Sequence, residues 1–245
     1  MISRMMANAR RILLLSSSTV HGSGYLEYAA GHIKEFLQKS KVKTILFVPY
    51  ALKDHNEYLN KVQGPLKQLG YAVEGIHEAT NAIDAIKKAE AIYIGGGNTF
   101  LLLKTLYDLN LIEPIKERVL KDGIPYIGSS AGSNVATASI NTTNDMPIVW
   151  PPTLTALALV PFNINPHYID FDPDSKHKGE TREERISQYH EIPGSPPVLG
   201  LREGAILQVE GDVAKILGTY GAKLFTVENQ PQEFRVGEEV SFLLK

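Results

Sequence analysis

Residues 126–134 read Tyr-Ile-Gly-Ser-Ser-Ala-Gly-Ser-Asn, so that Gly-x-Ser-x-Gly directly follows a short apolar run. This pattern is typical of a nucleophile elbow, a sharp turn from a strand into a helix that exposes one side chain. We predict that Gly128 and Gly132 are needed because side chains there would collide with neighbouring backbone. The exposed hydroxyl is then Ser130, and the N–H of Ala131 at the helix start favours developing negative charge beside it. A serine that only caps the helix fits this stretch equally well.

The chain before this stretch alternates short apolar runs with amphipathic segments. The expected strands are 11–15, 44–49, 71–77, 91–94 and 125–127, and the expected helices are 25–38, 57–69, 82–89, 99–109 and 111–121. This alternation predicts an α/β protein with right-handed βαβ units and a mainly parallel sheet flanked by helices.

After residue 134 the pattern changes to loops rich in turn-forming residues and to short β-like runs. The expected elements are a strand at 160–164, a helix opened by a capping box at 181–184, and strands at 198–201, 206–209, 213–217, 223–227 and 240–244. We expect the strands from residue 198 onward to be antiparallel. One α/β domain over residues 1–245, with residues 1–10 as a loosely ordered extension, accounts for the whole chain.

Composition limits the classes of function. The 245 residues are 43% hydrophobic and 21% charged, as in ordinary globular proteins. A net charge of −2 gives no positive electrostatic field that would attract polyanions, so we expect neither nucleic acid nor membrane as a partner. Without cysteine, any covalent nucleophile must be an oxygen. No run reaches the ~18 apolar residues of a membrane span, and the expected location is the cytoplasm.

Four loops follow expected strands at their carboxyl ends, where parallel sheets carry functional groups: 16–19, 50–55, 95–98 and 128–134. The loop Gly-Gly-Gly-Asn at 95–98 can bring backbone amides close to a ligand. Its spacing is not that of the dinucleotide fingerprint, so a nucleotide cofactor is poorly supported.

A serine nucleophile needs a base, and the base needs an orienting partner. Of the seven histidines, only His167 directly follows an expected strand, although a purely structural histidine is an alternative. Asp145 and Glu203 compete as the orienting acid. Asp145 lies between the serine and the histidine, as in α/β-hydrolases, whereas Glu203 follows a strand. The spacing does not separate the two.

Arg182 falls in the first turn of an expected helix. A cation there opposes the helix dipole by about 0.3–1 kcal/mol, so local stability does not explain it. The guanidinium could bind a substrate carboxylate through two hydrogen bonds. A solvated ion pair with Glu180 or with an acidic residue later in the helix is the alternative.

Five segments together resemble the α-aspartyl dipeptidase (peptidase E) family of serine peptidases. They are Gly-Gly-Gly-Asn-Thr-Phe (95–100), Tyr-Ile-Gly-Ser-Ser-Ala-Gly (126–132), Asn-Thr-Thr-Asn-Asp-Met-Pro-Ile (141–148), Phe-Asn-Ile-Asn-Pro-His (162–167) and His-Lys-Gly-Glu-Thr-Arg (177–182). The similarity runs from about Ile12 to the C-terminus. It is greater to animal members, which share Ser-Ser before Ala-Gly where bacterial members carry Trp-Ser. Ser133 replaces an alanine of the bacterial members.

The resemblance implies a three-layer fold similar to class I glutamine amidotransferases, with serine where those enzymes carry cysteine. It implies the following roles: Ser130 as nucleophile, His167 as base, Glu203 or Asp145 as the acid with Glu203 favoured, the amides of Gly97 and Ala131 as oxyanion donors, and Arg182 with Asn98 as substrate-binding residues.

The activity implied by the resemblance is hydrolysis of the peptide bond after an N-terminal aspartate, through an acyl-enzyme. Small Asp-X dipeptides are the expected substrates, neither metal nor cofactor is required, and the protein would be a monomer or a homodimer. Another serine hydrolase on this scaffold, such as an esterase or a peptidase of aspartyl polymers, is the first alternative. A non-catalytic module whose loop at 95–97 holds a phosphate or nucleotide is the second.

Overall fold

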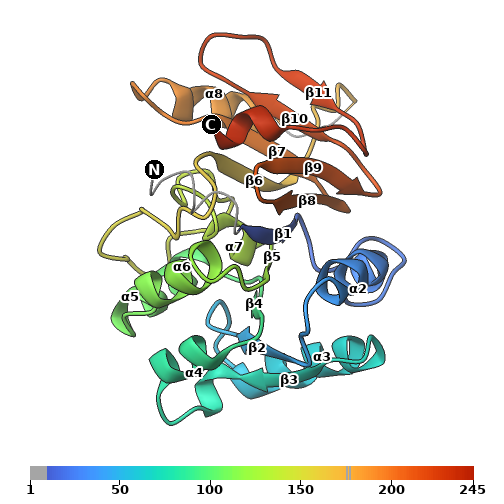
Figure 1. The fold of residues 1–245 in the computed structure, drawn as a ribbon. Coiled ribbons are helices and arrows are strands. Elements are labelled where there is room, and N and C mark those ends of the chain that lie inside the picture. Colours follow the sequence, from blue (N-terminus) through green and yellow to red (C-terminus); the bar gives the residue numbers. More distant parts are fainter. Residues whose placement is uncertain (1–9, 175, 177) are drawn as a thin grey trace.

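The computed structural model describes residues 10–174, 176 and 178–245, so the extension predicted at 1–10 lies outside the described residues except for Arg10. A seven-stranded sheet with the order β3-β2-β4-β5-β1-β8-β9 forms the centre (Figure 1). Its strands are β1 (Arg11–Leu15), β2 (Thr44–Val48), β3 (Ala72–Gly75), β4 (Ile92–Ile94), β5 (Tyr126–Ser129), β8 (Ala205–Glu210) and β9 (Val213–Gly218).

The first five strands of that order are parallel, whereas β8 is antiparallel to both β1 and β9. Helices cover both faces of the sheet (Figure 1). They are α2 (Ala30–Gln38) and α3 (His55–Gln68) on one face, and α4 (Ala82–Lys88), α5 (Thr99–Asp108) and α6 (Ile112–Leu120) on the other. The α/β class predicted from the alternation of elements is therefore confirmed.

β1 explains why the strands of this sheet are apolar at successive positions. Ile12 and Leu14 belong to the apolar cluster that also contains residues of α5 and α6. Leu13 and Leu15 belong to the cluster on the opposite face, with residues of α2 and α3. Because neighbouring side chains of a strand point to opposite faces, a strand covered on both faces must be apolar throughout.

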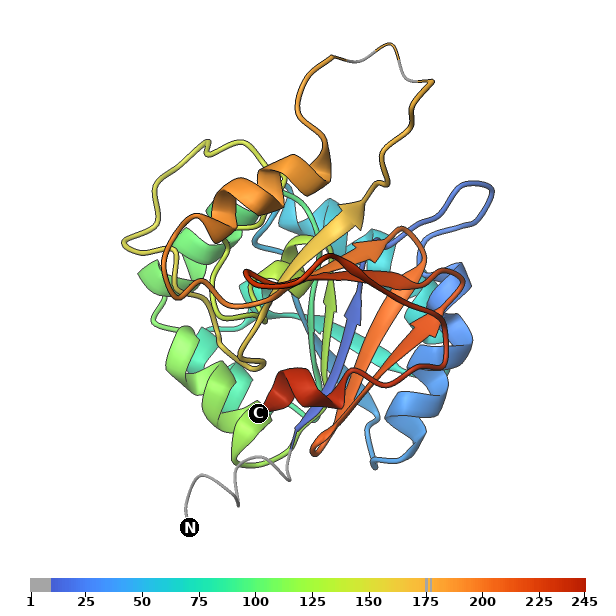
Figure 2. The same ribbon diagram turned by 90° about the horizontal axis from the view of Figure 1, so that it is seen from above.

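A second sheet of four strands has the order β11-β10-β7-β6. Its strands are β6 (Asn163–Tyr168), β7 (Val198–Arg202), β10 (Ala222–Phe225) and β11 (Gln232–Phe234), and it lies with α8 (Arg182–His190) near the β8–β9 edge of the first sheet (Figure 1). Leu199 and Leu201 of β7 share an apolar cluster with Leu207 of β8. Figure 2 shows β1, β5 and β6 ending on the same side of the molecule.

The structure differs from the predicted elements at two places near the end of the chain. The strand predicted at 240–244 is wrong, because Ser241–Leu244 forms a 3-10 helix. Val240 and Leu243 are buried there while Phe242 is 49% exposed, which is helical rather than alternating spacing. β11 was not predicted, since its sequence Gln-Glu-Phe carries a single apolar residue.

The strand predicted at 160–164 also lies further along the chain, as β6. The pairing of β6 with β7 shifts register between Asn165 and Tyr168, and the strand resumes after the shift. His167 therefore lies inside an irregular strand rather than after it. No helix within the described ranges is long and apolar enough to cross a membrane.

Candidate active site

Ser130 occupies the turn between β5 and α7 (Ala131–Asn134). Its φ of 51° and ψ of −109° are unusual for a residue with a side chain, and such strain is found at functional sites. The backbone N–H of Ser130 donates to the carbonyl of Leu15, 3.1 Å away at the end of β1. The Ser130 hydroxyl makes no hydrogen bond to the first turn of α7, so this serine does not cap the helix.

Two glycines make the turn sterically feasible. A Cβ at Gly128 would meet the backbone of Gly132, and a Cβ at Gly132 would meet the carbonyl of Ile94 in β4. The collisions predicted from the sequence are therefore present, and they identify close contact of α7 with two neighbouring strands.

The structure brings Ser130, His167 and Glu203 together. Nε2 of His167 lies 2.9 Å from Oγ of Ser130, and Nδ1 of His167 lies 2.8 Å from Oε1 of Glu203. An ionised carboxylate only accepts hydrogen bonds, so Nδ1–H donates to Glu203 and Nε2 is left to accept from the serine hydroxyl. The imidazole is 36% exposed and the Glu203 side chain 55% exposed, so the group is open to solvent on one side.

Asp145 lies at the start of α5 instead. Its Oδ2 accepts from the N–H of Thr99 at 2.8 Å, from the Thr99 hydroxyl at 2.6 Å and from the Thr143 hydroxyl at 3.2 Å. A carboxylate at a helix N-terminus is favoured by the free N–H groups and the helix dipole. Within the part of the chain that is described, Asp145 makes no hydrogen bond to His167.

The loop 95–98 borders Ser130. A Cβ placed on Gly96 would lie 3.0 Å from the Cβ of Ser130 and 3.6 Å from its Oγ. Gly97 has a φ of 134° and packs against the carbonyl of Ala51. Among the described residues, the N–H groups of Gly97 and Ala131 donate to no protein acceptor.

Asn98 serves as the N-cap of α5. Its Oδ1 accepts from the N–H of Leu101 at 3.0 Å, and its Nδ2 donates to the carbonyl of Met146 at 2.8 Å. The side chain predicted to bind substrate therefore contacts two segments of the protein that flank the site.

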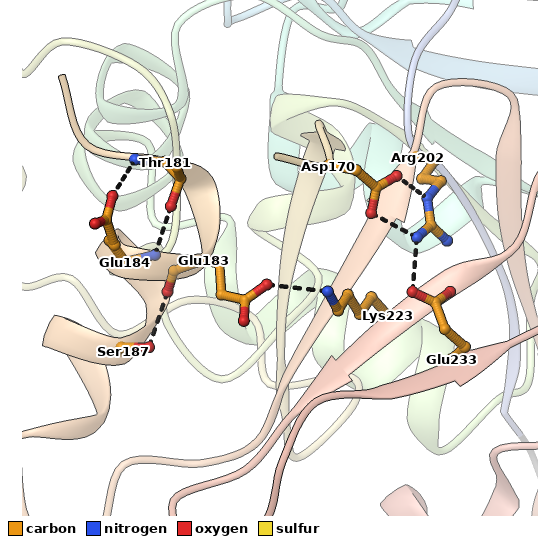
Figure 3. Close-up of polar contacts among 8 residues, drawn as sticks. All are labelled: Asp170, Thr181, Glu183, Glu184, Ser187, Arg202, Lys223 and Glu233. Carbon is orange, nitrogen blue, oxygen red and sulfur yellow. Dashed lines mark hydrogen bonds and ion pairs between the residues drawn. The ribbon is translucent and has the colours of Figure 1, made fainter. Parts of the chain in front are cut away.

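Arg182 is the first residue of α8 and lies inside the capping box predicted at 181–184. The N–H of Glu184 donates to Oγ1 of Thr181 at 3.1 Å, and the N–H of Thr181 donates to Oε2 of Glu184 at 2.6 Å (Figure 3). Glu180, the surface partner considered for Arg182, instead lies 3.7 Å from Nε of Arg185. In the described part of the chain, Arg182 has no ion pair.

A cavity of about 210 Å³ is lined by Arg182, Asn144, Asp145 and Asn165, among other residues. Burial, followed by the positive charge of Arg185, lowers the pKa of Arg182. Nδ2 of Asn144 donates to the carbonyl of Pro166, 2.6 Å away and next to the candidate base. The cavity therefore joins the arginine to the segment that carries His167.

Ion pairs hold the segments around this cavity to the second sheet. Nζ of Lys223 in β10 lies 2.9 Å from Oε2 of Glu183 in the first turn of α8 (Figure 3). Arg202 contacts both oxygens of Asp170, at 2.6 and 2.7 Å, and Oε1 of Glu233 at 2.9 Å (Figure 3). Arg202 immediately precedes Glu203, so these pairs restrain two segments that carry candidate site residues.

Sequence reasoning missed a buried hydroxyl network beneath the elbow. The hydroxyl of Tyr93 lies 3.0 Å from Oγ of Ser129 and 3.0 Å from the hydroxyl of Tyr25. Burial raises the pKa of Tyr93 well above its ordinary range, so the phenol stays neutral. Tyrosines this far apart in the chain leave no local pattern. Over the described ranges, His, Asp and Glu nowhere gather in threes that could hold a metal.

The α/β sheet and an elbow serine in contact with a histidine define the class of protein, a hydrolase with a nucleophile elbow. The sequence pattern of peptidase family S51 matches residues 12–217. The chain belongs to peptidase family S51, and the resemblance drawn from its five segments is confirmed.

Relatives and solved structures agree with this assignment. A protein named probable alpha-aspartyl dipeptidase from Drosophila melanogaster is 52% identical over 240 residues, which are 98% of this chain and 100% of the relative. Peptidase E of Streptomyces coelicolor is 49% identical over 95% of this chain and 94% of its own length. The similarity to an animal member agrees with the Ser-Ser motif.

Two crystal structures support the fold alone, because their sequences are distant. A putative peptidase E from Listeria monocytogenes EGD-e has a TM-score of 0.66 and 24% identity, over 86% of this chain and 98% of the other. A peptidase from an acI-B1 actinobacterium has a TM-score of 0.71 and 19% identity, over 95% of this chain and 97% of the other.

Proposed function

We propose that this peptidase releases an N-terminal aspartate from Asp-X dipeptides, with Ser130 as its nucleophile. The observation that carries the proposal is the unbroken series of hydrogen bonds from Glu203 through His167 to Ser130, at 2.8 and 2.9 Å. A serine hydroxyl becomes a useful nucleophile only when a neighbouring base takes its proton. The name of the Drosophila relative, probable alpha-aspartyl dipeptidase, supports the choice of substrate.

The first half of the reaction forms an acyl-enzyme. Oγ of Ser130 attacks the carbonyl carbon of the aspartyl residue while Nε2 of His167 accepts the hydroxyl proton. The carbon–nitrogen bond then breaks, and Nε2 returns the proton to the nitrogen of the departing amino acid. The aspartyl group is left as an ester on Ser130.

The second half regenerates the serine. Water attacks the ester carbonyl and gives one proton to Nε2 of His167. The bond from the carbonyl carbon to Oγ breaks, Oγ takes the proton from Nε2, and free aspartate leaves. Throughout both halves the carboxylate of Glu203 stabilises the positively charged imidazolium and holds the ring in place.

The oxyanion of each tetrahedral intermediate is proposed to bind the N–H groups of Gly97 and Ala131. Ala131 directly follows Ser130, and Gly97 directly follows Gly96, whose added Cβ would lie 3.0 Å from the Cβ of Ser130; neither amide has a protein acceptor among the described residues. Each such donor is worth about 2.7–4 kcal/mol of transition-state stabilisation in other hydrolases.

Arg182 is proposed to recognise the side-chain carboxylate of the aspartate. Its support is the lack of an ion pair in the described part of the chain, its partial burial, and its place in the cavity beside Asn144. A neutral side chain in that site would leave the guanidinium desolvated and unpaired, so Asn or Ala should be strongly rejected.

Glu203 is proposed as the orienting acid because of its hydrogen bond to Nδ1 of His167. Asp145 is proposed to act indirectly, by holding the segment 143–146 against the start of α5. Asn98 caps the same helix and lies next to the oxyanion donor Gly97, so it shares this supporting role.

Hydrolysis of an aspartyl chromogenic amide by wild-type protein and Ser130→Ala tests the proposal. Wild type should release the chromophore, and Ser130→Ala should be slower by about 10⁴–10⁶-fold with an unchanged circular dichroism spectrum. Turnover retained by the purified variant would remove Ser130 from its role.

The rates at which the protein hydrolyses esters, aspartyl polymers and dipeptides test whether it is another serine hydrolase of the same scaffold. Faster turnover of esters or aspartyl polymers than of dipeptides would contradict the dipeptidase assignment. Stabilisation by nucleotides, without labelling of Ser130 by a fluorophosphonate, would favour a binding module instead.

A further inference from the structure

The end of β1 contacts the backbone of every segment that carries a member of the proposed triad. The carbonyl of Leu15 accepts from the N–H of Ser130 at 3.1 Å. The hydroxyl of Ser16, the next residue, accepts from the N–H of His167 at 2.9 Å. These contacts join the two sheets at the point where the serine and the histidine meet.

Ser16 also fixes the turn that carries Glu203. Its hydroxyl donates to the carbonyl of Leu201 at 2.8 Å, and its backbone N–H donates to the carbonyl of Ala205 at 3.0 Å. Leu201 and Ala205 lie two residues before and two residues after Glu203. One residue therefore holds both ends of the turn and the backbone of the histidine.

The bond to His167 comes where β6 is irregular. His167 has a φ of 53°, which is uncommon for a residue other than glycine, and the pairing of β6 with β7 shifts register there. The hydroxyl of Ser16 supplies the acceptor for this N–H. Ser16 is fully buried, so water cannot replace the hydroxyl without rearrangement.

We propose that Ser16 is a positioning residue of the triad, an inference that rests on the proposed function. Its hydroxyl holds the left-handed backbone of His167 and the turn of Glu203 at one point, so that the imidazole reaches both partners. The role requires a donor and an acceptor on one short side chain. Alanine provides neither, and threonine adds a methyl group in a fully buried position.

The first experiment compares Ser16→Ala with a matched control, Ser133→Ala. Ser133 is also fully buried, and its hydroxyl makes two hydrogen bonds, to the carbonyls of Leu15 at 2.7 Å and Gly128 at 3.0 Å. Within the described ranges, its hydroxyl makes no hydrogen bond to His167 or to residues 201–205. Each variant thus loses one buried hydroxyl with two hydrogen bonds, and both should show a lower Tm.

Only Ser16→Ala should lose turnover. We expect its kcat for the aspartyl amide to fall by about 10–100-fold while KM changes by less than about threefold, because misplacement of a catalytic group slows the chemical step. Ser133→Ala should keep kcat within about threefold of wild type. Equal kcat values for the two variants would overturn the proposal.

A double-mutant cycle with Glu203→Gln tests the route of the effect. If Ser16 acts through the pair of His167 and Glu203, then Ser16→Ala should cost much less in a Glu203→Gln background than in wild type. If the loss of kcat in the double variant equals the product of the losses in the two single variants, the positioning role is contradicted. If Ser16→Ala does not fold, Ser16→Cys takes its place, because cysteine keeps a weak donor and acceptor. Its kcat must then fall below that of wild type while its KM stays unchanged.

The rate of labelling of Ser130 by a fluorophosphonate separates this inference from the proposed function. Labelling requires an activated serine but no peptide substrate. If wild type labels rapidly and does not cleave the amide, the substrate assignment fails, and labelling of Ser16→Ala slowed by about tenfold still supports the positioning role. Unchanged labelling of Ser16→Ala refutes it.

Discussion

Nδ1 of His167 lies 2.8 Å from Oε1 of Glu203, although the two residues are 36 positions apart and belong to segments on either side of α8. β6 and β7 are parallel neighbours, so the residues near their carboxyl ends lie side by side. This pairing gives Glu203 a contact with the imidazole that Asp145 does not have among the described residues.

The two acids should differ when each is made neutral. Glu203→Gln should lower kcat by roughly 10²–10⁴-fold with a small change in KM, because it removes the charge that stabilises the imidazolium. Asp145→Asn should lower kcat less and should lower the free energy of unfolding by about 0.5–1.5 kcal/mol, through weaker bonds to Thr99. Steady-state kinetics and urea unfolding of both variants make the comparison. A larger loss of kcat in Asp145→Asn would reverse the assignment.

Arg182 should control the choice of the first residue. Arg182→Ala should reduce the ratio of kcat/KM for Asp over Asn at that position by at least about tenfold, because the carboxylate loses its partner. Arg185→Ala serves as the matched control, since Arg185 lines the same cavity but already lies near Glu180. If the ratio survives in Arg182→Ala and falls in Arg185→Ala, the second arginine is the specificity residue.

Gly132 should not tolerate a side chain. Gly132→Ala should lower the free energy of unfolding by about 1–3 kcal/mol and should also lower activity, because its Cβ meets the carbonyl of Ile94. Gly31→Ala is the control, since the same substitution on the exposed face of α2 meets no atom within 4 Å. That control should gain about 0.5–1 kcal/mol of stability. Chemical denaturation of both proteins gives the measurement, and equal effects would argue against close packing at the elbow.

The strained backbone conformation of Ser130 should lower the Tm of the protein. Ser130→Gly should abolish hydrolysis yet raise Tm relative to Ser130→Ala, because glycine adopts a φ of 51° without strain. Differential scanning calorimetry of the two inactive variants isolates this effect from the loss of the hydroxyl. A Tm for Ser130→Gly at or below that of Ser130→Ala would mean that the turn stores little strain.

The ion pair beside Glu203 should make stability depend on pH. The hydrogen bond from Arg202 lowers the pKa of Asp170 below its ordinary value of 3.8. A carboxyl whose pKa is lower in the folded than in the unfolded protein stabilises the fold at pH values above its unfolded-state pKa. This contribution is lost as the pH falls through its folded-state pKa. The difference in Tm between wild type and Asp170→Asn should therefore be present at pH 7 and shrink as the pH falls below 3.8. The side chain of Asp170 is half-exposed, so a small difference is expected; a difference that does not shrink as the pH falls below 3.8 would exclude this ion pair as its source.

The sequence by itself determined the elements that depend on neighbouring residues. The alternating apolar runs predicted the parallel strands and their helices, because a strand buried on both faces must be apolar at every position. The glycines at 128 and 132 predicted the turn at Ser130, since only glycine fits where backbones touch. The same local rules failed at β11, which carries a single apolar residue, and at 240–244, where Val240, Phe242 and Leu244 alternate as in a strand although the segment forms a 3-10 helix.

Only the tertiary structure decided which distant groups meet. The contact of Glu203 with His167 and the contact of Ser16 with His167 across 151 positions depend on how the strands are ordered and how the two sheets pack, whereas the hydroxyl pair of Tyr93 and Ser129 depends on the pairing of β4 with β5. Side chains separated this far in the chain leave no periodic signal, because their distance is set by how the sheets pack together. The sequence therefore proposed the serine and its candidate partners, and the packing of the sheets determined which of these side chains are in contact.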